Sequence, residues 1–395
     1  MRKLYLDPPL QLVFGITLMV VLGVSTIFPV IPDIMREFDL KPTEVGLILT
    51  VFTLPGIVLT PLAGMLADRY GRRAVLIPSL LVFGAFGGLC ALAPDFPSLL
   101  ILRFVQGLGA TALGMLATTL IGDLYRGRDL AAAMGYNAAV LSIGTAAYPA
   151  LGGLLGMLGW RAPFLLHLSA LPLAWLVARK LQVKPLEKSE PFMTYIRSAC
   201  RHMSTAATLG LFATTFATFI MLYGPVITFY PILLDQRFDA LPVTIGLIIS
   251  SASIFAGSIA SQLGRITAVV PEAWLIRLGC LLYVACFAIT PFIGDIWLLL
   301  LPMALFGLAQ GLTMPSMMTL LNRMAPSRYR AGYMAVYGTL LRLGQTVGPL
   351  LAGGMHAWLG MDSVFLAASL LALAMLAMVI TLVRPTACAA EDPAG

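Results

Sequence analysis

Charged residues are scarce in this chain. Asp, Glu, Lys and Arg make up 11% of its 395 residues, apolar residues make up 59%, and the mean hydropathy is +0.92. Soluble globular domains carry roughly 25% charged residues. The scarcity therefore excludes a soluble domain of this size and indicates an integral membrane protein.

Several kinds of chemistry are missing as well. The five cysteines show neither metal-ligand spacing nor a disulfide framework. The chain has no Gly-x-x-x-x-Gly-Lys-Ser/Thr phosphate loop, no His-Glu-x-x-His zinc motif and no Gly-x-Ser-x-Gly nucleophile turn. We therefore predict that the protein is not an enzyme, has no catalytic residue, metal or cofactor, and is not driven by ATP.

What the chain has instead is long apolar runs. Twelve are long enough to cross about 30 Å of hydrocarbon, so we predict an all-α membrane protein with twelve transmembrane helices. The first run follows Met1-Arg2-Lys3 but lacks a small-residue cleavage site, and we interpret it as a retained helix. The runs lie near residues 10–33, 44–67, 74–93, 97–121, 130–157, 162–180, 206–234, 242–264, 273–293, 296–321, 331–358 and 362–383.

The positive charges are distributed unequally between the ends of these runs. Of the 25 Lys and Arg residues, 18 fall at one set of ends, four at the other and three within runs. The positive-inside rule assigns the richer side, with both termini and the polar linker, to the cytoplasm. The net charge of +7 is thereby explained by topology, and we predict no nucleic-acid partner.

The two sets of six runs repeat each other. Phe38-Asp39 recurs as Phe238-Asp239 and Pro149 as Pro349, each at an offset of 200 residues. Two pseudo-symmetric six-helix halves of this kind enclose a substrate site near the middle of the membrane, which rocking exposes to either side. We predict halves at 1–181 and 206–385, a cytoplasmic linker at 182–205 and a tail at 386–395.

The loop between the second and third runs is the most specific motif. It reads Gly-Met-Leu-Ala-Asp-Arg-Tyr-Gly-Arg-Arg and resembles the signature loop of the major facilitator superfamily of transporters. The resemblance implies that Arg72 pairs with Asp123 and that Asp68 faces the helix beginning near Ala331. An alternative is a set of topology charges without any gate. The implied cytoplasmic gate consists of Gly64, Asp68, Arg69, Gly71, Arg72, Arg73 and Asp123.

Two further segments carry the resemblance. Arg103 to Gly109 resembles the family's buried-arginine motif, and Gly144 to Gly153 resembles its Gly-x-x-x-Gly-Pro-x-x-Gly-Gly antiporter motif, with Tyr148 in place of one glycine. The family likeness is greatest to drug:proton antiporters. Helix packing alone is the alternative for the glycines. The packing residues implied by this motif and its second copy are Gly144, Pro149, Gly152, Gly153, Gly344, Gly348 and Pro349.

Charges within the apolar runs are candidate functional groups, because burying them in a membrane is costly. We expect Arg103 either to pair with Asp33 or to extend its side chain to the headgroup region of the membrane. Arg342 falls near the bilayer centre, where it binds an anionic or zwitterionic substrate or pairs with backbone carbonyls. No acid falls at the middle of a span, where a proton-coupled transporter usually has a protonatable group, and His167 is only a weak substitute for such an acid. The predicted cavity residues are Arg342, Gln106, Asn137, Tyr223 and Gln310.

These observations predict a secondary active transporter of the bacterial plasma membrane. It would export a small amphipathic drug or metabolite by alternating access, with the proton as coupling ion, and act as a monomer among membrane lipids. One alternative is a dedicated carrier of an organic anion or zwitterion, such as a siderophore, recognised by Arg342. Another is a transport-inactive receptor or scaffold with the same fold.

Overall fold

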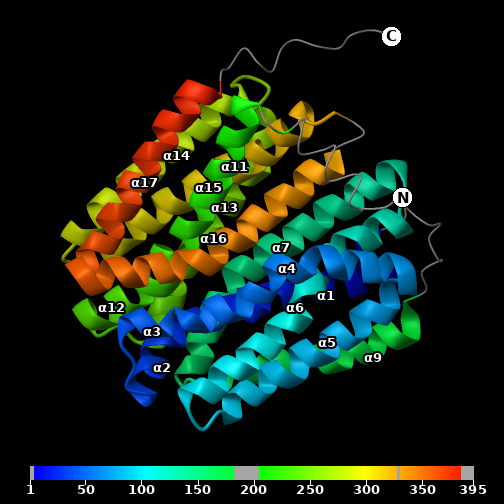
Figure 1. Ribbon diagram of the computed structural model, residues 1–395, viewed down its shortest axis with the longest axis horizontal. Coiled ribbons are helices and arrows are strands. Elements are labelled where there is room, and N and C mark those ends of the chain that lie inside the picture. Colours follow the sequence, from blue (N-terminus) through cyan, green and yellow to red (C-terminus); the bar gives the residue numbers. More distant parts are fainter. Residues whose placement is uncertain (1–3, 182–202, 204, 327–329, 384–395) are drawn as a thin grey trace. The chain divides into compact units, whose positions relative to one another are not determined.

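The computed structural model describes residues 4–181, 203, 205–326 and 330–383, and its elements over these ranges are all helical (Figure 1). Eleven helical segments in them are long and apolar enough to cross a membrane. A further helix, α16 (Arg330–Leu359), has 30 residues and carries Arg342. The prediction of an all-α membrane protein is therefore confirmed. Nearly all of the predicted linker and the whole predicted tail lie outside the described residues.

The chain forms two compact units, and the first comprises residues 1–189 and 230–250. In it α4 and α5 both pack on α6, and α1 packs on α6 and α7. The short α12 belongs to this unit and lies against α2. Its main helices are α1 (Pro8–Ser25), α2 (Ile31–Glu37), α3 (Pro42–Val45), α4 (Leu47–Tyr70), α5 (Arg72–Leu89), α6 (Phe96–Leu124), α7 (Gly127–Gly156), α8 (Ala162–Leu165), α9 (Ala170–Lys180) and α12 (Tyr230–Phe238).

The second unit comprises residues 190–229 and 251–395. Here α14 packs on α15 and α17, and α11 packs on α16. The predicted boundaries of the sequence halves stay a prediction, since the compact units divide the chain differently around residues 230–250. The helices of this unit are α11 (Ala206–Met221), α14 (Glu272–Ile289), α15 (Leu300–Met324), α16 and α17 (Met361–Leu382), while α13 (Pro242–Ile266) begins in the first unit and continues in the second.

The same close helix contact occurs once in each unit. A side chain at Gly107 would begin 2.2 Å from the Phe52 carbonyl oxygen, and one at Gly307 would begin 2.1 Å from the Ala252 carbonyl oxygen. Gly307 and Ala252 lie 200 residues after Gly107 and Phe52, the same offset as that of the repeated motifs. Only glycine permits this approach of two helix backbones, so the sequence repeat is also a structural repeat.

Two of the predicted spans are interrupted. After α1 the chain forms a 3₁₀ turn, η2 (Phe28–Val30), before α2. The sixth span contains η4 (Leu166–Ser169), a 3₁₀ turn between α8 and α9 that carries His167. Prolines contribute to the first interruption, because Pro29 and Pro32 have no N–H with which to continue the α-helical bonding. The breaks free backbone carbonyls inside the first unit.

The seventh span contains a π-helical segment, η5 (Leu222–Phe229), which follows α11. Pro225 lies inside it and cannot donate a backbone hydrogen bond, and the Thr228 hydroxyl donates to the Tyr223 carbonyl at 2.7 Å. Short π-helical stretches occur frequently at functional sites. This one places the Tyr223 side chain in the second unit close to Arg342.

Candidate functional site

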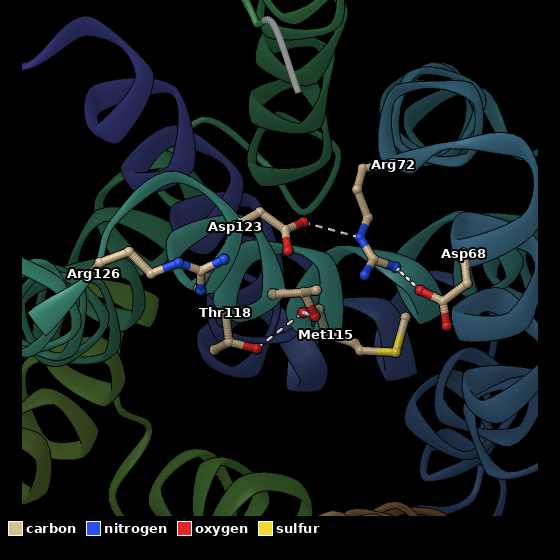
Figure 2. Close-up of polar contacts among 8 residues, drawn as sticks. Asp68, Arg72, Met115, Thr118, Asp123 and Arg126 are labelled. Carbon is tan, nitrogen blue, oxygen red and sulfur yellow. Dashed lines mark hydrogen bonds and ion pairs between the residues drawn. The ribbon is translucent and has the colours of Figure 1, made fainter. Parts of the chain in front are cut away.

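The cytoplasmic-gate candidates include one nearly buried cation between two acids. Arg72 opens α5 and is only 7% exposed, with Nη1 donating to Asp68 near the end of α4. Its Nε donates to Asp123 Oδ2, near the end of α6, at 3.1 Å. Figure 2 shows the guanidinium between the two carboxylates. The structure thus brings Arg72 and Asp123 together as the family resemblance implies, while their role as a gate stays a prediction.

The other members of the loop surround this cluster. Gly71 has a φ of +94°, a conformation that side-chain-bearing residues rarely adopt, and it allows the sharp turn between α4 and α5. Arg73 donates to the Ala178 carbonyl on α9, whereas Arg69 lies over the Tyr70 ring. Gly64 lies against Met115. The predicted contact of Asp68 with the helix start near Ala331 stays a prediction, because the Ala331 side chain is outside the described part of the structure.

A second ion pair occupies the corresponding place in the second unit. Arg323 Nη1 lies 2.8 Å from Glu272 Oε1, and both positions are offset by 200 residues from Asp123 and Arg72. The signs of the charges are exchanged, since the acid Glu272 takes the place of Arg72 and the cation Arg323 takes the place of Asp123. The Glu272 side chain is 6% exposed and that of Arg323 is 58% exposed. Sequence reasoning missed this pair, although the repeat offset could have identified it.

The buried arginine of the first unit has partners other than those expected. Arg103 is 0% exposed, so it does not reach the headgroup region, and it has no bond to Asp33. Its Nη1 donates to Gln106 Oε1 at 2.6 Å, and its Nη2 donates to the Gly23 carbonyl at 3.0 Å. The guanidinium also lies 4.1 Å from the centre of the Phe52 ring. Both expectations for Arg103 were wrong because backbone carbonyls and an amide solvate it instead.

Asp33 instead takes part in an exposed network at α2. Arg36 donates to Asp33 at 2.5 Å and to Asp235 on α12 at 2.6 Å. A second pair joins Arg161 to Glu37 at 2.9 Å. Of these residues, Asp33, Arg36, Glu37 and Asp235 line a cavity of about 580 Å³ in the first unit. Asp33 therefore lies with exposed charges, because the chain turns at η2 before reaching it.

Arg342 lies on α16 in the second unit, and its side chain is partly accessible. Its Nη1 donates to Gln345 Oε1 at 3.4 Å, a long hydrogen bond, and the Gln345 side chain also lies near the hydroxyl of Tyr223. Within the described residues no carboxylate forms an ion pair with Arg342. The predicted residues Arg342 and Tyr223 therefore share one polar cluster, and Gln345 is a member that sequence reasoning missed.

The remaining predicted cavity residues have different surroundings. Gln106 is 0% exposed beside Arg103, so it does not line an open cavity. Asn137, 7% exposed, accepts a hydrogen bond from Thr17 at 2.7 Å. Gln310 is half-buried and accepts from Tyr283. The structure therefore does not unite the five predicted cavity residues in one site.

The antiporter-motif glycines lie at close helix contacts. A side chain at Gly152 would begin 2.1 Å from the Thr26 carbonyl oxygen, and one at Gly153 would begin 2.3 Å from that of Pro242. Nearby, the backbone N–H of Ala150 donates to Ser250 Oγ at 3.0 Å. In the second unit Gly344 and Gly348 contact the backbone of α11 in the same way, while Gly144 has only side-chain neighbours.

The comparisons with known proteins agree with this architecture. The family model described as Major Facilitator Superfamily matches residues 13–296 and 207–394. Together the matches cover nearly the whole chain. The protein therefore belongs to the Major Facilitator Superfamily, and it is a multi-pass membrane transporter, not an enzyme.

Its relatives include exporters and resistance proteins. Multidrug resistance protein 2 of Bacillus subtilis is 26% identical over 343 residues, which is 84% of each chain. The bacillibactin exporter of Bacillus subtilis is 34% identical over 157 residues, or 38% of this chain and 39% of that protein. An inward-facing, unoccupied bacterial homologue of the human lysosomal transporter Spinster shares the fold, with a TM-score of 0.75, 18% identity and 98% and 96% coverage.

Proposed function

We propose that the protein exports a small amphipathic molecule, a drug or a metabolite, in exchange for protons. The observation that carries this proposal is similarity to a multidrug resistance protein over 84% of both chains. The close glycine contacts of α7 are those expected of the antiporter motif. The proposal places a monomer in a bacterial plasma membrane, with both termini on the cytoplasmic side and lipid around it.

In the proposed cycle, the two six-helix halves alternate in exposing the substrate site to each side of the membrane. The Arg72 cluster acts as the cytoplasmic gate. Its guanidinium is 7% exposed, and all three side chains belong to the first unit, so separating the cation from a carboxylate requires α4, α5 and α6 to move within that unit. Hydrogen bonds to charged groups contribute about 1.5–3 kcal/mol each, an energy that substrate or proton binding can offset.

Everted membrane vesicles test proton antiport directly. Respiration acidifies their interior, and acridine orange reports the pH gradient, with ethidium as the probe substrate. We expect ethidium to accumulate inside while protons leave, and nigericin, which removes the pH gradient, to abolish the accumulation. Accumulation that persists in nigericin would contradict coupling to the pH gradient. Vesicles without the protein are the control.

A second candidate function is transport of an organic anion or zwitterion. The observation in its favour is Arg342, a partly accessible guanidinium whose hydrogen bond to the Gln345 side chain is long. A cation held in a low-dielectric site without a counter-charge attracts an anionic group strongly. Tyr223, beside it, supplies a hydroxyl and an aromatic face for the rest of such a molecule.

Ligand-induced thermal stabilisation separates the two candidates. The probes are 2,3-dihydroxybenzoate, an anion, and tetraphenylphosphonium, a lipophilic cation, tested on the wild type, Arg342→Gln and Arg342→Lys. A ligand at 100 times its dissociation constant stabilises the native state by about 2.7 kcal/mol. If the anion stabilises the wild type and Arg342→Lys but not Arg342→Gln, Arg342 binds substrate. Binding of either probe without its movement across vesicles would favour a receptor.

A further inference from the structure

Besides Nε1 of Trp160, the described part of the first unit contains two buried polar atoms without hydrogen bonds, and they belong to neighbouring side chains. These are Nε2 of Gln106 and Nε2 of His167, and both residues are 0% exposed. A side chain at Gly87 would begin 2.4 Å from Gln106 Nε2 and 2.5 Å from His167 Cβ. The Gln106 amide nitrogen and the His167 Cβ are thus separated by no more than the sum of these two distances, so the two side chains are neighbours. Buried polar groups without partners are rare and require an explanation.

The hydrogen bonds around the ring fix the role of each nitrogen. Nδ1 of His167 lies 2.9 Å from the Phe164 carbonyl oxygen, which can only accept, so Nδ1 carries the proton. Nε2 is then an acceptor with a free lone pair. Gln106 directs its oxygen to Arg103, which leaves its amide N–H groups as donors. Arg103, Gln106 and His167 therefore form a polar row in which only the last position can take up a proton.

The carbonyls at the end of α1 solvate the cations of this row. The last carbonyls of a helix have no intrahelical N–H partner, and in α1 the chain leaves the helix after Ser25. The carbonyl of Gly23 accepts from Arg103, and that of Leu22 contacts the His167 ring. One helix end thus provides an acceptor to Arg103, and it would provide one to His167 once Nε2 carries a proton.

This end of α1 cannot stabilise two full positive charges at once. Like charges a few ångströms apart in a medium of low dielectric constant repel each other strongly. Other than His167 itself, the titratable or charged side chains near this site are Arg103 from α6 and the buried thiol of Cys90, which opens the 3₁₀ turn η3 (Cys90–Leu92), while α5 contributes Phe83 and Gly87. No carboxylate among the described residues neutralises Arg103.

We propose that Nε2 of His167 is the proton-binding site that couples transport. A proton arriving from outside the cell bonds to the Nε2 lone pair and forms an imidazolium, and the Leu22 carbonyl and Gln106 reorient around it. Arg103 then loses its hold on the Gly23 carbonyl, which loosens α1 from α6. Release of the proton to the cytoplasm restores the neutral ring and the Arg103 contact. The 3₁₀ turn η4 gives His167 local freedom to move, because its backbone lies outside regular α-helix.

The proposal rests on proton antiport as the function, and transport measurements with His167→Asn test the coupling. Ethidium is the probe, and His356→Asn in the second unit is the matched control. We expect His167→Asn to lose accumulation driven by the pH gradient at least tenfold while it still equilibrates ethidium downhill. A residue that only stabilises the fold would affect both activities alike. Full pH-driven accumulation by His167→Asn would overturn the proposal.

Nuclear magnetic resonance of the wild type in lipid nanodiscs tests the site apart from transport. The chain has three histidines, so ¹⁵N-histidine labelling gives few signals, which single His→Gln variants assign. We expect Arg103→Gln to raise the proton affinity of His167 at least tenfold, one pH unit, with no change at His356 and a smaller change for Arg103→Lys. An unchanged His167 titration in Arg103→Gln would refute the site. If the wild type does not couple ethidium to protons, antiport of this probe fails, and the titration still decides the site.

Discussion

Replacing Gly107 by alanine tests the helix contact that holds the first unit together. The new methyl carbon would lie 2.2 Å from the Phe52 carbonyl oxygen, whereas ordinary contacts begin near 3.4 Å. The backbones of α4 and α6 must therefore separate by about 1 Å. Overpacking of this kind costs about 1–3 kcal/mol, and we expect the upper end because the obstacle is backbone.

The same helix supplies the control. A methyl group added at Gly122 on α6 would meet no atom within 4 Å, so Gly122→Ala should stabilise the helix by about 0.5–1 kcal/mol. The assay is thermal unfolding of both purified variants in the same detergent. At about 2–4 °C per kcal/mol, Gly107→Ala should lower the melting temperature by roughly 6–12 °C. A Gly107→Ala protein as stable as Gly122→Ala would refute the reasoning.

Three other predictions concern charged groups. Asp123→Asn should weaken the Arg72 cluster and raise the access of cytoplasmic thiol reagents to the substrate pathway, as measured by labelling of a reporter cysteine; unchanged labelling would contradict a gate. Glu272→Gln and Arg323→Gln should each lower the free energy of unfolding by about 1 kcal/mol, and the double variant should lose less than the sum of the two. Strictly additive losses in this double-mutant cycle would show that the ion pair contributes no interaction energy. The Ser98 hydrogen bonds lower the pKa of Asp95 below its ordinary value of 3.8. The ionised Asp95 carboxylate therefore stabilises the folded protein above pH 3.8, and this contribution is lost as the pH falls through the lowered pKa. Melting curves from pH 6 to pH 2 should show a smaller acid-dependent loss for Asp95→Asn.

The sequence was sufficient to predict the helices and the repeat, because membrane spans are determined by length and hydropathy alone. Prolines at the end of the first span were visible, yet the turn at η2 that moves Asp33 away from Arg103 depends on how the chain packs. The true partners of Arg103 are backbone carbonyls, which no pattern of residue types reveals. This is why the wrong counter-ion was expected.

Only those contacts of the candidate site that a motif or a sequence spacing records could be predicted. Arg72 and Asp123 could be paired because a family motif contains both. Glu272 and Arg323 belong to no such motif, and only the offset of 200 residues would have linked them. Gln345 lies one turn from Arg342 on the same helix face, a spacing that the sequence does contain.

The two ion pairs related by the repeat differ in their relation to the helix dipoles. Arg72 begins α5, where the positive end of the dipole disfavours a cation, and both of its acids lie near the negative ends of α4 and α6. Glu272 begins α14 and Arg323 lies near the end of α15, so both charges of the second pair are favoured by their own helices. The first cluster is thus held by mutual attraction against three dipoles, which suits the contact that we propose opens during transport. The second is supported whether or not its partner is present, which suits a contact that persists.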